Sequence, residues 1–110
     1  MKIFVQNGNV ITLTAPYAVS SGGGALVGSI FGVAQSDVAN AASGEFVVEG
    51  VVDIAKAVGA LAQGALVYWD NTGKLATGSA TSNKLIGVVT VAALSGDATA
   101  RVRLNGAFVS

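Results

Sequence analysis

Alternation of apolar and polar residues is the dominant pattern along the chain. It is clearest in residues 98–108, where small and apolar side chains fall on one face and polar ones on the other. The first face holds Ala98, Ala100, Val102, Leu104, Gly106 and Phe108, and the second holds Thr99, Arg101, Arg103 and Asn105. A period of two residues is typical of a strand with one buried and one wet face.

Further segments show the same periodicity. Residues 46–54 place Phe46, Val48, Val52 and Ile54 on one face. The other face holds Val47, Glu49, Val51 and Asp53, and Glu45, just before the segment, lies on the same side. Residues 84–93 are apolar on both faces, which predicts a central strand. Shorter candidate strands are residues 2–6, 10–14, 25–27, 30–35, 65–70 and 74–77.

Turn residues separate these candidate strands. Asn7-Gly8 predicts a tight hairpin between the first two, and residues 70–73 and 95–97 predict turns further on. The single helical candidate is residues 54–63, which contains Gly59 and stops at Gly64, so we expect one or two turns at most.

Three short blocks recur in the same order. Gly24-Ala25-Leu26-Val27 returns as Gly64-Ala65-Leu66-Val67, residues 30–33 (IFGV) return as residues 85–88 (LIGV), and residues 46–51 return in weaker form as residues 102–107. The pattern indicates either a duplicated β unit within one domain or chance matching in a chain rich in Gly, Ala and Val.

Composition excludes several classes of chemistry. The 110 residues are 52% hydrophobic and 11% charged, with six basic and six acidic residues and neither Cys nor His. Disulfides, thiolate nucleophiles, zinc–thiolate sites and imidazole bases are therefore excluded. A net charge of zero gives no bulk attraction to nucleic acid. We also expect no signal peptide and no membrane-spanning helix.

The nucleotide-binding motifs fail on their spacing. Gly73-Lys74 is the only Gly-Lys pair, and Leu75 follows it where a phosphate-binding loop needs Ser or Thr. Gly22 and Gly24 lack the third glycine of a dinucleotide fingerprint, because Val27 occupies its place. Both segments are better interpreted as turns, and we expect no cofactor and no metal.

The charged and aromatic residues favour contacts over catalysis. Glu49 and Asp53 stand about 13 Å apart on one strand, too far for a coupled acid–base pair. Arg101 and Arg103 share a face without interleaved aromatic residues, which favours cross-strand or subunit-interface ion pairs with those acids. Tyr68 and Trp69 are neighbours on a strand, so one ring is expected in the core and the other is a candidate contact anchor, with core packing of both rings as the alternative.

Several blocks resemble a family of small phage proteins. They are residues 4–16 (FVQNGNVITLTAP), 20–28 (SSGGGALVG), 31–34 (FGVA), 64–70 (GALVYWD), 85–88 (LIGV) and 101–106 (RVRLNG). The family is that of phage and prophage capsid decoration, or cement, proteins, similar to the lambda-type head decoration protein with its β-clip-like fold. Some members are labelled predicted phage recombinases, but this chain lacks the phosphate-binding loop and the α/β core that an ATP-dependent recombinase needs.

Together these observations predict a mostly-β protein, a small single-domain β-barrel or β-clip-like fold over residues 1–110, with at most one short helix and a possible N-terminal arm at residues 1–8. The resemblance implies a non-enzymatic homotrimer, made in the bacterial host cytoplasm, that binds the major capsid protein on the outside of the phage head and stabilises the shell. We expect no nucleic-acid, membrane or small-molecule partner.

Residues for these contacts follow from position and pattern. The candidate capsid-binding residues are Met1, Lys2, Ile3, Phe4 and Val5, and the candidate subunit-interface residues are Glu49, Asp53, Trp69, Arg101 and Arg103. The alternative functions are another phage structural module, in the tail, baseplate, fibre or minor head, and more remotely a small carboxylate-dependent hydrolase.

Overall fold

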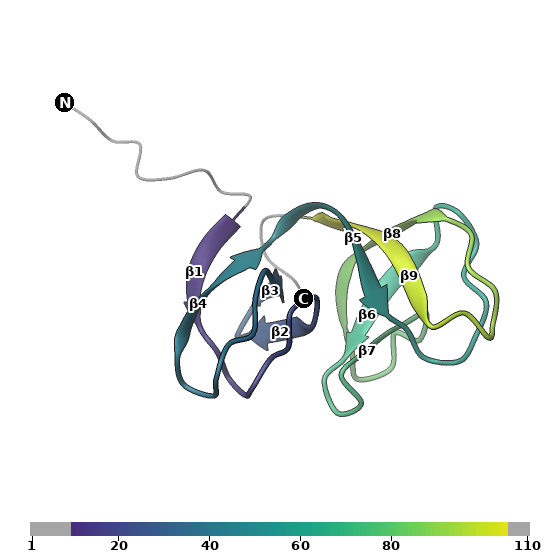
Figure 1. Cartoon of the computed structure of the whole chain (residues 1–110). Coiled ribbons are helices and arrows are strands. Elements are labelled where there is room, and N and C mark those ends of the chain that lie inside the picture. The colour runs from purple at the N-terminus through teal and green to yellow at the C-terminus, as the bar shows by residue number, and fades with distance from the viewer. Residues whose placement is uncertain (1–9, 106–110) are drawn as a thin grey trace.

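The chain forms two antiparallel sheets in the computed structural model, which describes residues 10–105 (Figure 1). The strands are β1 (Val10–Thr14), β2 (Gly24–Val27), β3 (Ile30–Ala34), β4 (Ser43–Val47), β5 (Glu49–Ala55), β6 (Leu66–Asp70), β7 (Leu75–Thr77), β8 (Lys84–Val91) and β9 (Thr99–Asn105). The mostly-β prediction is confirmed. The expected strand at residues 2–6, the Asn7-Gly8 hairpin and the end of the strand at 98–108 lie outside the described residues.

The strand orders are β1-β4-β3-β2 in the first sheet and β5-β9-β8-β6-β7 in the second. The predicted central strand at residues 84–93 is confirmed, because β8 lies between β9 and β6. The outer strands of the second sheet approach each other at one point, where Lys56 and Ala76 form an isolated bridge and the Ala57 N–H donates to the Ala76 carbonyl over 2.8 Å. One bridge is not a ladder, so the described strands form open sheets and not the closed barrel that the sequence suggested.

The single strand predicted over residues 46–54 is wrong in one respect. The chain leaves the first sheet after Val47 and enters the second at Glu49, so this segment contributes to both β4 and β5. Val48, at the crossing, is 5% exposed and Phe46 and Ile54 are buried as well. Because alternate side chains stay buried through the crossing, periodicity alone does not reveal it.

The helix expected at residues 54–63 does not form. Ile54 and Ala55 finish β5, and Lys56 and Leu61 make isolated strand bridges. Gly59 has a φ of 134°, which a right-handed helix does not allow. The side-chain spacing that suggested a helix belongs instead to an extended loop whose backbone is tied to the second sheet.

The internal repeat is real and extends to strand pairing. If the N-terminal half (residues 10–47) is compared with the C-terminal half (residues 49–105), the order β1-β4-β3-β2 recurs as β5-β9-β8-β6, and β7 is an addition. The register recurs too: Ala25 pairs with Gly32 as Val67 pairs with Gly87. The two halves are therefore copies of one β unit.

The first sequence block, however, is two residues out of structural register. Gly22 and Gly64 are the true equivalents, because both have φ near 83–84°. The N–H of Gly22 donates to the carbonyl of Ala34 on β3, and the N–H of Gly64 donates to the carbonyl of Val89 on β8. Gly24 is thus equivalent to Leu66, and the GALV match that drew attention to the repeat is a local coincidence within a real duplication.

Two aromatic contacts join the halves. The rings of Phe31 on β3 and Trp69 on β6 lie 4.9 Å apart at 53°, and Phe31 and Val33 are buried in the core of the C-terminal half. On the surface, the Lys74 ammonium lies 4.2 Å from the ring centre of Tyr17. Burial raises the pKa of Tyr17, and a backbone hydrogen bond at Leu26 lowers it in part.

Lys56 marks a difference between the halves. It is 6% exposed, and its ammonium donates to three backbone carbonyls, of Ala57 (3.0 Å), Leu94 (3.1 Å) and Ser95 (3.3 Å). The equivalent position in the N-terminal half is Ala15, which makes the matching backbone hydrogen bond to Ala42 that Lys56 makes to Ala98. Lys56 therefore fixes the loop that follows β8 onto the loop that follows β5.

Substitution of the equivalent glycines on β3 and β8 tests how closely the strands approach. A Cβ at Gly32 meets the Cβ of Phe46 at 2.8 Å, and one at Gly87 collides with the backbone carbonyl of Arg103. We expect Gly32→Ala and Gly87→Ala each to lower the free energy of unfolding by about 1–3 kcal/mol in urea titrations, with Gly87→Ala the more damaging. Gly96→Ala is the control, because its Cβ meets nothing within 4 Å; equal effects at all three positions contradict this packing.

Removal of the Lys56 ammonium tests its structural role. Lys56→Met keeps much of the apolar stem and leaves three part-buried carbonyl contacts without their donor, so we expect the free energy of unfolding to fall by about 1–3 kcal/mol. Lys84→Met, at a half-buried lysine for which no hydrogen bond is found among the described residues, is the matched control. An unchanged denaturation midpoint in Lys56→Met is inconsistent with this role.

Candidate docking surface

The wet face of the second sheet is the most distinctive exposed surface among the described residues. Alternation along β5 puts Glu49, Val51 and Asp53 on this face, and all three are exposed. Pairing with β9 sets Val51 opposite Arg103 and Asp53 opposite Arg101. We call this surface, formed by β5, β9, β8 and the start of β6, the C-terminal face.

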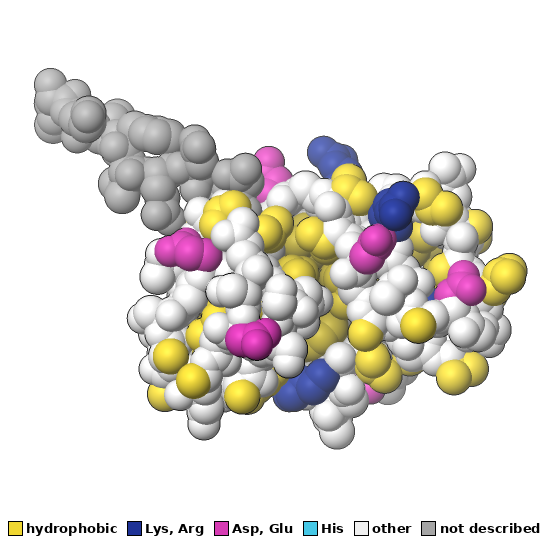
Figure 2. All heavy atoms as spheres, in the orientation of Figure 1, with side chains coloured by type: hydrophobic (Ala, Val, Ile, Leu, Met, Phe, Trp, Pro, Cys, Tyr) yellow, Lys and Arg dark blue, Asp and Glu magenta, His cyan; other side chains and the backbone are white. Residues whose placement is uncertain are grey.

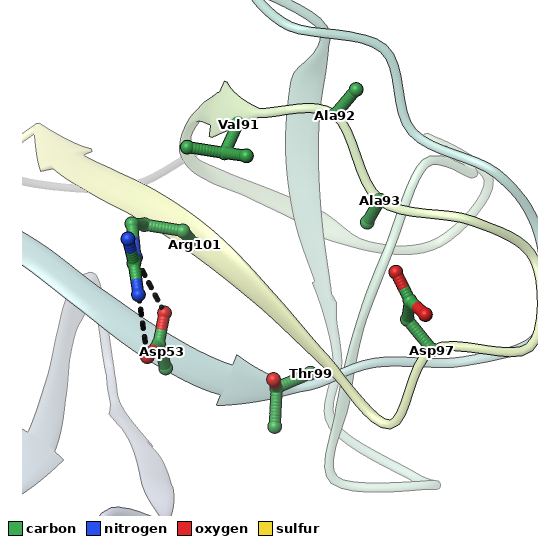
Figure 3. Close-up of a pocket in the computed structure, with 7 residues that line it drawn as sticks. All are labelled: Asp53, Val91, Ala92, Ala93, Asp97, Thr99 and Arg101. Atoms are coloured by element: carbon green, nitrogen blue, oxygen red, sulfur yellow. Dashed lines mark hydrogen bonds and ion pairs between the residues drawn. The ribbon is translucent and has the colours of Figure 1, made fainter.

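Asp53 and Arg101 form a cross-strand ion pair on this face. Nε of Arg101 lies 3.0 Å from Oδ1 of Asp53, and Nη2 lies 3.4 Å from Oδ2 (Figure 3). The hydrogen bond to Asp53, reinforced by its negative charge, raises the pKa of the Arg101 guanidinium. Both side chains are about half exposed, at 55% and 52%, so water screens the pair and it adds little to stability. Its main consequence is that Asp53 neutralises Arg101.

Arg103 lies in a row of apolar side chains that crosses four strands. The register places Val51 beside Arg103, Arg103 beside Val88, and Val88 beside Leu66. Val51 is 55% exposed and Leu66 is 50% exposed. Among the described residues no ion pair is found for Arg103. An exposed arginine flanked by exposed apolar side chains is a composition typical of the centre of a protein–protein contact.

The sequence did not identify Leu66, Val88 or Val91 as part of this surface. Residues 84–93 are apolar on both faces, which predicted a central strand and singled out no exposed face, yet Val88 is half-buried and Val91 is 53% exposed. The pairing of β8 with β9, which sets Val88 opposite Arg103 and Val91 opposite Arg101, is what places these valines on the exposed face. That pairing could not be known from the sequence.

A shallow groove borders the ion pair. Figure 3 shows it lined by Asp53, Val91, Ala92, Ala93, Asp97, Thr99 and Arg101, with the Asp97 carboxylate pointing toward Ala93. Oδ2 of Asp97 accepts the Leu94 N–H over 2.8 Å, so this acid holds its own loop. The groove thus offers one neutralised acid and one loop-capping acid.

Three of the other four carboxylates are similarly engaged in local structure, Glu49 being the exception. Asp37 accepts the Ser21 N–H, Asp70 accepts the N–H groups of Thr72 and Gly73, and Glu45 accepts the Thr12 hydroxyl. In residues 10–105 no cluster of three acids is placed to hold a metal ion. The same part of the chain contains no helix of the length and apolar character needed to cross a bilayer.

The remaining predicted contact residues have different locations. Glu49 is exposed and lines a hollow with Gly87, Val88, Arg103 and Leu104. Trp69 is only 1% exposed, and its indole N–H donates to Oδ1 of Asn71 over 3.1 Å, so its prediction as an interface anchor is corrected: the ring belongs to the core. Met1, Lys2, Ile3, Phe4 and Val5 lie outside the described residues.

Charged side chains on the visible surface are few and unevenly placed. Figure 2 shows basic and acidic side chains side by side over β5 and β9, and hydrophobic side chains in the hollow between the two halves. The C-terminal face therefore combines apolar area, the Asp53–Arg101 ion pair, and two further charges of opposite sign, Glu49 and Arg103, for which no ion pair is found among the described residues. Such a surface is suited to docking a macromolecule.

Comparison with known proteins agrees with the family indicated by the sequence blocks. No curated protein and no solved structure matches the chain. A family model described as phage cement protein matches residues 5–104, nearly the whole sequence. The chain belongs to the phage cement protein family.

Proposed function

We propose that this protein decorates the outer surface of a phage head, as a homotrimer that bridges neighbouring major capsid proteins and stabilises the shell. Membership of the phage cement protein family is the observation that carries the proposal. The exposed C-terminal face supports it, since a chain with 11% charged residues leaves apolar surface that a partner can cover. The proposed role is binding and not catalysis, and its place is the virion, after synthesis in the host cytoplasm.

The proposal assigns capsid binding and subunit contact to two different parts of the chain. Met1–Val5 serves as the capsid-facing segment and can add to the edge of a sheet in the shell. Glu49, Asp53, Arg101 and Arg103 serve at the contact between subunits. The four residues lie on one face of the second sheet, which supports their use in a single contact.

Stabilisation follows from multivalency. A trimer that holds three shell subunits makes the second and third attachments at high effective concentration, so individually weak contacts give tight overall binding. Dissociation of a shell subunit then requires that it also breaks its contacts with the cement protein. This mechanism opposes the outward pressure of packaged DNA without any chemical step.

Capsid binding is the direct test of the proposal. Purified protein is mixed with capsids that lack it, and occupancy is measured by co-sedimentation and electron microscopy. We expect saturable binding at micromolar concentration or below, density at three-fold positions, and a higher temperature for shell disruption. Absence of binding at micromolar concentration, or attachment to tails alone, contradicts the proposal.

The role of the N-terminal segment has its own test. Phe4→Asp places a charge within the proposed capsid-facing segment, and we expect it to weaken capsid binding while leaving the melting temperature unchanged. Val58→Asp is the matched control, because Val58 is 91% exposed in the loop after β5. If both variants bind capsids like the original protein, the segment is not the capsid contact.

A further inference from the structure

Two exposed charges of opposite sign lie close together on the C-terminal face. Glu49 on β5 and Arg103 on β9 are both exposed, and neither side chain makes an ion pair or a hydrogen bond with any residue in the range 10–105. The register sets Arg103 opposite Val51, so Glu49 is its diagonal neighbour, at about 7–8 Å in an antiparallel pair. Both charges border the same hollow, with Val88 beside them.

The other charged side chains of the described residues already have partners or are partly covered. The acids that accept hydrogen bonds from their own chain are Asp37, Glu45, Asp53, Asp70 and Asp97. Among the bases, Lys56 and Lys74 donate to backbone carbonyls, Arg101 pairs with Asp53, and Lys84 is half-buried. Within residues 10–105, Glu49 and Arg103 are thus the exposed acid and the exposed base whose charges the chain leaves unpaired.

This pair of charges makes the C-terminal face complementary to a copy of itself. Because Asp53 neutralises Arg101, the face carries one free charge of each sign and has no net charge. Rotational symmetry can place Glu49 of one copy against Arg103 of the next, so that each copy supplies one acid and one base. Val51, which is 55% exposed, lies two residues from Glu49 and opposite Arg103. It provides apolar area between the two charges, as the centre of a protein contact requires.

We propose that the C-terminal faces of neighbouring copies meet, with Glu49 of one copy paired to Arg103 of the next and Val51 between the pairs. This inference rests on the self-association in the proposed function and names the side chains that carry it. The pairing closes in any rotationally symmetric assembly, including the proposed trimer, because every copy offers the same two charges.

The first sheet is a poorer partner for this face. Residues 10–47 contain no Lys or Arg that could pair with Glu49 of another copy. Part of that sheet is also covered by the C-terminal half of its own chain, since Val33 belongs to the core of that half and Gly24 packs against Trp69. A second C-terminal face, by contrast, presents both complementary charges on exposed positions.

Exchange of the two charges tests the pairing. Mass and dissociation constant are measured by analytical ultracentrifugation over a range of protein concentrations. We expect Glu49→Arg and Arg103→Glu each to weaken self-association by about 10- to 100-fold, because like charges then meet across the contact. The double variant exchanges the charges and should recover most of the association. Melting temperatures should stay unchanged, because neither charge is paired within the chain. Thr81→Glu and Thr81→Arg, in the exposed loop before β8, are the controls for added charge.

Cross-linking at Val51 tests the geometry independently of these charges. The chain contains no cysteine, so Val51→Cys introduces a single reactive thiol. We expect a short bis-maleimide to link this variant efficiently into covalent dimers, and the yield to fall when Arg103→Glu is added. Val58→Cys is the matched control, because Val58 is 91% exposed in the loop after β5 and lies outside the C-terminal face.

The outcomes separate this contact from the proposed function. Equal cross-linking at the two cysteine positions, unchanged association of Glu49→Arg or Arg103→Glu, or a double variant no better than the single ones overturns the contact and leaves the decoration role standing. An assembly of two copies that responds to the charge exchange supports the contact and overturns the trimer. A monomer at every concentration overturns both, whereas capsid binding is measured separately.

Discussion

The constraint on which this structure depends is the two-sided nature of its strands in a chain with few charges. Burial of alternate residues, such as Ala100, Val102 and Leu104 on β9, fills the core from one face of the sheet. The opposite face must then be covered by whatever residues remain, and only twelve of the 110 residues are charged. Valine and leucine consequently share the exposed face with a few charged side chains. Such a mixture is suited to binding the surface of another macromolecule.

Because the two halves share one fold, equivalent positions in them can be compared within one molecule. Features that recur, such as the close-packed glycines at 32 and 87 and the positive φ of Gly22 and Gly64, are what the β unit needs to fold. Features that differ show how each half is specialised. Lys56 in place of Ala15 ties two loops together, and Arg101, which is ion-paired with Asp53, stands where the N-terminal half has Glu45. The fold is thus shared, while surface chemistry differs between the copies.

The sequence predicts the strands well because their signal is local. The bounds of β1 were predicted as found, and those of β3, β6 and β7 within one residue, since alternation and turn residues act over short distances. The passage of the chain between sheets at Val48 and the burial of Trp69 were not predictable, because each depends on contacts with the other half. The Asp53–Arg101 pair could be proposed from the sequence, because it involves two strands with clear alternation. The row from Val51 to Leu66 could not, because it depends on the pairing of four strands.

The central claim is that the C-terminal face is a docking surface, and its solvent exposure in the assembled state tests that claim most directly. Hydroxyl-radical footprinting can compare isolated protein, dissociated by dilution, with protein bound to capsids, at four exposed apolar residues: Val51, Leu66, Val58 and Leu94. Coverage of the face predicts strong protection of Val51 and Leu66 on assembly, with Val58 and Leu94 less affected. Equal reactivity of Val51 and Leu66 in the two states would contradict the account.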